Sequence, residues 1–127
     1  MTPKKLSQLF WKHARKIKPS IGKIRLEIGK PSEFPQPRNH AYTYGVPGGP
    51  LRVVFAPRIF QADTARTVAL IRHELAHALM LYQGVNHTER QCDAVAETLW
   101  KAPIYYDAED VQTLRKGVRP RPGHLPK

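Results

Sequence analysis

His73-Glu74-Leu75-Ala76-His77 is the stretch of this 127-residue chain from which its fold and chemistry can be worked out. Histidines four residues apart lie one above the other on one face of a helix, so both imidazoles can bind one metal ion. Glu74 follows the first histidine directly and can hold and deprotonate a metal-bound water. The H-E-x-x-H arrangement is the zinc site of metal-dependent hydrolases. Because a five-residue match can arise by chance, the flanking sequence has to support it.

The residues around the motif predict a long, mostly buried helix. Asp63 or Thr64 can cap its start, and Gly84 can end it. The motif therefore falls in mid-helix, where the four-residue spacing places both histidines on one face. Apolar side chains recur at three- and four-residue steps, which is the helical period, at Ala65, Val68, Ala69, Ile71, Leu75, Ala76, Leu79 and Met80.

A catalytic zinc usually has three protein ligands and a fourth position for water, so a third ligand is expected downstream. Glu89, Asp93 and Glu97 are spaced four apart on a second helical pattern. A helix that doubles back after Gly84 would direct Glu89 at the two histidines. Asp93, one turn further on, could then accept the second N–H of a ligating histidine and fix its orientation. The apolar positions of this second helix are Cys92, Val95, Ala96, Leu99 and Trp100.

Two other residues remain candidates for the third ligand. His87 lies in the connecting turn and would complete an all-histidine set, and Glu97 suits a longer spacing from His77. A metzincin-type site is excluded, because its third histidine would fall at Gln83 and its required glycine at Met80.

The two motifs together, His73-Glu74-x-x-His77 and Glu89-x-x-x-Asp93, resemble those of the gluzincins, the thermolysin-like clan of zinc peptidases. In that clan the third ligand is a glutamate, and an aspartate four residues later supports a histidine. The resemblance therefore implies a zinc peptidase with one Zn²⁺ per chain, bound by His73, His77 and Glu89. It gives Glu74 the role of general base and Asp93 that of a support for a histidine.

The second helix most resembles that of the ImmA/IrrE-type metallopeptidases, and the small minigluzincins are also similar. It reads ERQCDAVA at residues 89–96, with Leu99 and Pro103 behind it, where that family has E-x-x-A-[ND]-x-F-A followed by a leucine and a proline. Cys92 replaces the alanine and Val95 the phenylalanine, which are changes of packing. The resemblance covers about residues 51–103 and implies a restricted protein substrate, a regulator such as a DNA-bound repressor.

The sequence predicts a small α+β, zincin-like domain over residues 1–117. We expect an N-terminal helix ended by Pro19, then a three-stranded twisted sheet, the active-site helix and the second ligand-bearing helix. The strands are predicted at 24–28, 41–45 and 51–56. By the resemblance, the last strand borders the cleft and pairs with an extended substrate. The buried face of the N-terminal helix is predicted to be Leu6, Leu9, Phe10, Ala14 and Ile17.

The net charge of +11 is concentrated at the two ends of the chain. Residues 1–30 hold nine Lys or Arg against one Glu, and residues 115–127 hold five against no acid. This distribution favours docking to nucleic acid, an acidic protein or an anionic substrate, with solubility as the ordinary alternative. The Pro-rich tail at 118–127 is predicted to be extended, and its His124 could occupy the open zinc position and silence the enzyme.

No apolar run reaches the length of a membrane span, and the single Cys92 excludes an internal disulfide framework. We therefore expect a cytoplasmic protein without a membrane partner. The leading hypothesis is a zinc metallopeptidase that acts on a protein or peptide. One alternative is a non-catalytic, zinc-stabilised basic module that binds nucleic acid or an acidic protein, and another is a toxin- or antirestriction-type accessory protein of a mobile element. Possible oxyanion donors are Tyr42, Tyr44, Tyr82, Tyr105 and Tyr106.

Overall fold

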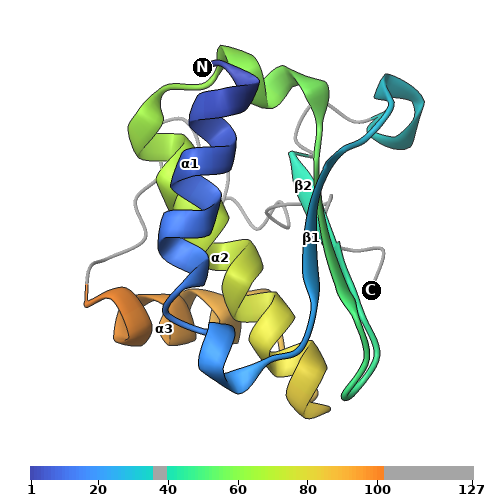
Figure 1. Cartoon of the computed structure of the whole chain (residues 1–127), viewed down its shortest axis with the longest axis vertical. Coiled ribbons are helices and arrows are strands. Elements are labelled where there is room, and N and C mark those ends of the chain that lie inside the picture. The colour runs from blue at the N-terminus through green and yellow to red at the C-terminus, as the bar shows by residue number, and fades with distance from the viewer. Residues whose placement is uncertain (36–39, 102–127) are drawn as a thin grey trace.

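Three α-helices and a three-stranded mixed sheet make up residues 1–35 and 40–101, the part of the chain that this computed structural model describes. The predicted α+β class and the order of its elements are confirmed. Helix α2 is the central element, and it packs against α1, α3 and the sheet (Figure 1). The elements are α1 (Pro3–Ala14), β1 (Ile24–Ile28), β2 (Ala41–Tyr44), β3 (Leu51–Phe55), α2 (Thr64–Gln83) and α3 (Glu89–Trp100).

The strand order is β1-β3-β2, so β3 lies in the middle of the sheet. It pairs parallel with β1, with Ile24 opposite Leu51, and antiparallel with β2, with Tyr44 opposite Arg52. The prediction that the strand at 51–56 borders the cleft and pairs with substrate is therefore wrong. Both of its edges are already hydrogen-bonded, because the short turn after β2 returns the chain alongside it while β1 takes the other side. The strand beside α2 that pairs on one side only, within the described residues, is β2.

The predicted apolar face of the N-terminal helix is buried as expected. Phe10 is fully buried, and its ring meets Phe55 of β3 edge-on at a centroid distance of 6.4 Å. Burying a side chain of this size contributes about 1.5–3 kcal/mol. This face of α1 shares one hydrophobic core with α2 and the sheet. The helix ends at Ala14, earlier than predicted, and Pro19 lies in a separate short 3₁₀ turn, Lys18–Ser20. The buried residues are Leu6, Leu9, Phe10 and Ala14 of α1, together with Ile17 just beyond its end.

Both ends of α2 follow the predicted capping chemistry. The Asp63 carboxylate accepts a hydrogen bond from the Arg66 backbone N–H at 2.8 Å, which settles the choice between Asp63 and Thr64 as the cap. Gly84 ends the helix in the left-handed region at φ 73°, and its N–H donates back to the Leu81 carbonyl. The chain then reverses within a few residues, which brings α3 back against α2.

Neither α1, α2 nor α3, the helices of the described residues, combines the length and the apolar character that crossing a bilayer requires. The predicted domain boundary at residue 117 and the tail at 118–127 lie outside the described residues.

Candidate metal centre

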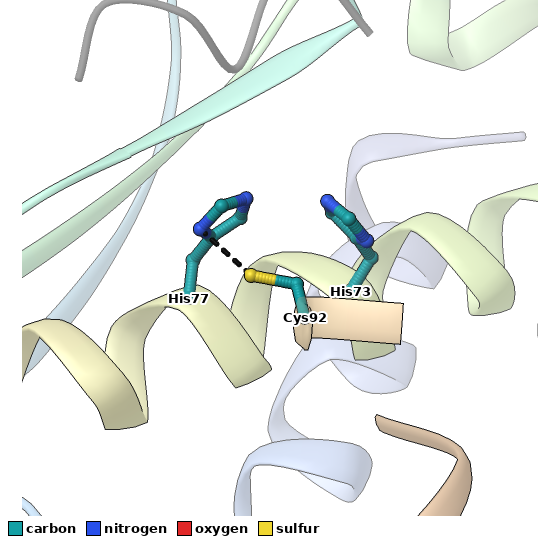
Figure 2. A group of neighbouring side chains, drawn as sticks. All are labelled: His73, His77 and Cys92. Carbon is teal, nitrogen blue, oxygen red and sulfur yellow. Dashed lines mark hydrogen bonds between the residues drawn. The ribbon is translucent and has the colours of Figure 1, made fainter. Parts of the chain in front are cut away.

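The H-E-x-x-H motif lies in the buried middle of α2. His73 and Glu74 have no exposed surface, and His77 is 1% exposed. The imidazole centroids are 4.8 Å apart, one helical turn from each other, and both rings extend from the same face of the helix (Figure 2). The four-residue spacing therefore does bring the two histidines together in a site shielded from solvent.

The start of α3 brings Glu89 to both histidines. Thr88 caps this helix, since its hydroxyl accepts from the Gln91 N–H while the Gln91 side chain accepts from the Thr88 N–H. Glu89 is therefore the first helical residue and is buried against α2. Its Oε1 lies 2.9 Å from His73 Nε2 and 3.1 Å from His77 Nε2.

Asp93 lies one turn further along α3 and meets the other edge of the His73 ring. Its Oδ1 is 2.6 Å from His73 Nδ1. An ionised carboxylate only accepts hydrogen bonds, so Nδ1 carries the proton and donates it. In the neutral ring, the lone pair of His73 is then on Nε2, the atom that faces Glu89.

His77 is oriented by a chain of hydrogen bonds that ends at a backbone carbonyl. His87 Nδ1 lies 2.8 Å from the Val85 oxygen and must donate to it, so Nε2 of a neutral His87 is an acceptor. That Nε2 lies 2.9 Å from His77 Nδ1, which therefore donates. The lone pair of the neutral His77 ring is again left on Nε2. Burial lowers the pKa of His77 to about 4, so this ring is neutral at physiological pH.

Three electron-pair donors thus converge on one point: two imidazole Nε2 atoms and Glu89 Oε1. Lone pairs at these separations repel one another unless a shared proton or a cation lies between them. Imidazole nitrogen with carboxylate oxygen is a donor set that suits divalent transition metals. Around a tetrahedral zinc with bonds of about 2.0–2.2 Å, neighbouring ligand atoms are ~3.2–3.6 Å apart. The observed 2.9 and 3.1 Å fit such an ion after a shift of a few tenths of an ångström.

A second set of ligands, His73, His77 and Cys92, could also hold a metal ion. Its donor atoms all lie within 4.8 Å of one another, and all three residues are buried (Figure 2). However, Cys92 Sγ lies 3.0 Å from His77 Nδ1, on the edge of the ring that already meets His87. A metal bound to both Nε2 atoms would instead face Glu89 Oε1, across the His77 ring from the Cys92 sulfur.

Glu74 points toward the sheet and is held there by Thr43 of β2. The Thr43 hydroxyl donates to Glu74 Oε1 at 2.7 Å and also lies 3.3 Å from the Glu74 backbone carbonyl. The negative charge of Glu74 is close enough to His77 to raise the pKa of that ring against the effect of burial. The Glu74 carboxylate is thus tied to β2 and interacts with the charge of His77, and it is separate from Glu89.

The other candidates for the third ligand lie elsewhere. His87 contacts His77 Nδ1 and lies on the far edge of that ring from Glu89. Glu97 is exposed, two turns beyond Glu89 on α3. Among the tyrosines, the Tyr42 hydroxyl donates its hydrogen bond to Glu33 and not to a residue of the histidine cluster. Tyr105, Tyr106 and His124 lie outside the described residues.

The sequence analysis did not predict the role of Thr43, and it did not predict that Cys92 contacts a histidine. Thr43 is one residue of a short predicted strand, and nothing in local spacing indicates that it meets a glutamate 31 residues later. Cys92 is fully buried, as its apolar helical position predicts. The same position places the Cys92 sulfur 3.0 Å from His77 Nδ1. Cys92 lies three residues after Glu89, so helical spacing could have indicated that it shares the face directed at α2.

Comparisons of this chain with models of protein families, with curated proteins and with solved structures found no match.

Proposed function

We propose that this protein is a zinc-dependent peptidase that uses His73, His77 and Glu89 as ligands and Glu74 as general base. The observation that carries the proposal is the convergence of two Nε2 atoms and Glu89 Oε1 beside a separate buried carboxylate. Three protein ligands leave one zinc position for water, which is the arrangement of catalytic sites. We expect one zinc per chain.

The residues divide the work of hydrolysis. Zinc bound here would polarise a water molecule and the scissile carbonyl. Glu74 accepts a proton as the water oxygen attacks the carbonyl carbon, and it delivers that proton to the amide nitrogen as the C–N bond breaks. The products are a carboxylic acid and an amine, so one water is consumed. Thr43 holds the Glu74 carboxylate in place, and Asp93 and His87 fix the tautomers of His73 and His77 so that both Nε2 atoms could bind a zinc ion.

The sheet offers a place for an extended substrate along β2. This strand pairs with β3 on one side, within the described residues, and Thr43 connects it to Glu74. A peptide added to its other edge would lie antiparallel or parallel to β2 with its backbone hydrogen-bonded. The resemblance to ImmA/IrrE-type metallopeptidases and minigluzincins supports a restricted protein substrate, such as a regulator, in the cytoplasm.

A non-catalytic, zinc-stabilised basic module is the second candidate, favoured by the net charge of +11. A structural zinc site is closed by four protein ligands and has no use for a base at its side. The two candidates therefore differ in what Glu74 does. A module predicts that Glu74→Gln changes nothing, whereas a peptidase predicts that the same change abolishes turnover.

The test measures zinc content and peptidase activity on the same preparations. We expect about one zinc per wild-type chain by metal analysis, retention of zinc in Glu74→Gln and loss of zinc in Glu89→Ala. Hydrolysis of labelled casein, and self-cleavage at high protein concentration, should both disappear in Glu74→Gln. Absence of zinc in the wild type after metal is supplied would disprove the site. A Glu74→Gln protein as active as the wild type would disprove the mechanism.

A further inference from the structure

A second possible site lies away from the convergent donors, where the ends of α1 and α3 meet the middle of α2. It is a pocket of about 430 Å³ lined by Lys12, His13, Arg15, Lys16, Arg72 and Trp100. Figure 1 shows α1 descending toward α3. The ring centroids of His13 and Trp100 are 6.4 Å apart. Four of its lining side chains are cationic, and no carboxylate lines it within the described residues.

Helix electrostatics accounts for only part of this charge. Cations near the C-terminus of α1 interact favourably with the helix dipole, which explains Lys12 and Lys16 without any ligand. Arg72 belongs to the middle of α2, where no such dipole acts on it. Its Nε is buried and has no hydrogen-bond partner among the described residues, an arrangement that costs free energy until an acceptor is supplied.

An anion in the pocket would meet the half-buried Arg72 side chain, and a small shift of the guanidinium would bring its Nε to an anion oxygen. Phosphate oxygens match a guanidinium well, because they can accept two parallel N–H bonds. The neighbouring cations would add long-range attraction, and residues 1–30 carry nine Lys or Arg against one Glu. The pocket therefore has the charge and the buried donor that a phosphate group requires.

The aromatic wall indicates what is attached to the phosphate. Trp100 is half-buried, packs against the core and lines the pocket, so its indole is held in place. A nucleic-acid base stacks on such a ring while cations follow the backbone, which is the usual recognition of single strands. The volume is within the range of pockets that enclose small ligands and suits one nucleotide unit. We propose that this pocket binds one nucleotide of a single-stranded nucleic acid, with the phosphate on Arg72 and the base on Trp100.

The first test measures binding of a labelled single-stranded oligonucleotide by fluorescence anisotropy at low salt. Arg72→Gln should weaken binding about tenfold, the effect of one charge-assisted hydrogen bond. Arg66→Gln removes the same charge from the same helix, where Arg66 is exposed beside Asp63, and should change affinity by about twofold or less. Equal losses in the two variants would mean unspecific attraction to a basic protein and would overturn the proposal.

A second pair of variants applies if Arg72→Gln does not fold, as judged by circular dichroism. Lys12→Gln with Lys16→Gln should weaken binding more than Lys4→Gln with Lys5→Gln, a matched double change at the other end of α1. In a Trp11→Phe protein the remaining tryptophan is Trp100, and the oligonucleotide should quench its fluorescence. Unchanged Trp100 fluorescence at saturating oligonucleotide would overturn the stacking.

Two further measurements distinguish binding of a nucleic-acid strand from binding of a free nucleotide or phosphate, and from the proposed peptidase activity. A mononucleotide or inorganic phosphate that competes as well as the oligonucleotide, at equal phosphate concentration, would overturn the assignment to a strand. The Glu74→Gln protein should bind the oligonucleotide as tightly as the wild type does, because the pocket is independent of the proposed hydrolysis. Failure of the peptidase assays would therefore leave the binding result standing, and the converse also holds.

Discussion

The Thr43 hydroxyl lies 2.7 Å from Glu74 Oε1 and ties an edge strand to the carboxylate of the central helix. Thr43→Val keeps the shape of the side chain and removes this hydrogen bond. We expect kcat to fall about tenfold to a hundredfold, the effect of losing a hydrogen bond to a charged group, with KM and zinc content unchanged. Thr43→Ser restores the hydroxyl and should recover most of the rate. A valine variant with full kcat would show that Glu74 is oriented by other contacts.

Asp93 should control zinc affinity without being a ligand. Its carboxylate accepts a hydrogen bond from His73 Nδ1 at 2.6 Å, and replacing such a partner typically lowers metal affinity about 10–100-fold. Asp93→Ala should show this loss in competition with a chelating dye. Glu97→Gln is the matched control, since it neutralises an exposed acid one turn further along α3. Equal affinities in the two variants would contradict the proposed role of Asp93.

The two possible ligand sets give different spectra when cobalt replaces zinc. Coordination by His73, His77 and Glu89 predicts visible ligand-field bands and no thiolate-to-cobalt charge transfer in the near ultraviolet. Coordination by Cys92 predicts that this charge-transfer absorption is present. We expect Cys92→Ala to leave the cobalt spectrum essentially intact and Glu89→Gln to change it. A charge-transfer band that disappears in Cys92→Ala would establish the set with Cys92 in place of ours.

Stability should fall as His13 is protonated. Burial, with Lys12 and Arg72 nearby, lowers the pKa of His13 below its usual 6.5 in the folded state. The unfolded chain therefore binds a proton more readily, and the free energy of unfolding decreases as pH drops from about 6.5 toward the lowered folded pKa. In His13→Asn this part of the pH dependence should vanish, because an amide does not titrate in this range. The asparagine can still donate a hydrogen bond to the Leu9 carbonyl, as His13 Nδ1 does. The measurement is urea unfolding of both proteins across this pH range, and identical slopes would refute the assignment.

Gly84 and Gly48 allow a matched comparison of how much stability is lost when alanine replaces a glycine at positive φ. Both adopt positive φ, at 73° and 72°, so alanine at either position should lose about 1 kcal/mol in the free energy of unfolding. A Cβ at Gly84 would also lie 3.3 Å from Pro47 Cγ, whereas one at Gly48 would meet nothing within 4 Å. Gly84→Ala should therefore be the more destabilised in thermal unfolding. Equal destabilisation would mean that Pro47 moves aside freely.

The sequence was sufficient for features that depend on local spacing. The period of α2, its caps at Asp63 and Gly84, and the face of α1 centred on Phe10 all follow from interactions between residues a few positions apart. The approach of Glu89 to the histidines was also predictable, because the short turn after Gly84 allows α3 only a narrow range of positions.

Features that depend on distant pairing were not predictable in this way. The strand order places β3 in the centre, and only the pairing of segments far apart in the chain decides that. The hydrogen bond from Thr43 to Glu74 depends on how β2 lies over α2, for which one sequence carries no periodic signal. Arg72 likewise reads as an ordinary polar residue beside the motif, and its buried Nε becomes evident only in three dimensions.

The contact between α3 and α2 has a consequence for turnover of the protein. Small side chains, Cys92 and Ala96, face Ala76 and Met80, so this apolar cluster buries less surface than the one beneath α1. Leu99 and Trp100 attach the end of α3 to the main core, whereas its first turns are attached by Glu89 and Asp93, whose partners are the histidines. A metal ion that bound the native state in preference to the unfolded chain would stabilise this contact, so metal-depleted protein should open locally at α3 and exchange its amide hydrogens there first. The rate of degradation in the cell would then depend on the zinc supply, and the metal-bound protein would persist longer than the metal-free protein.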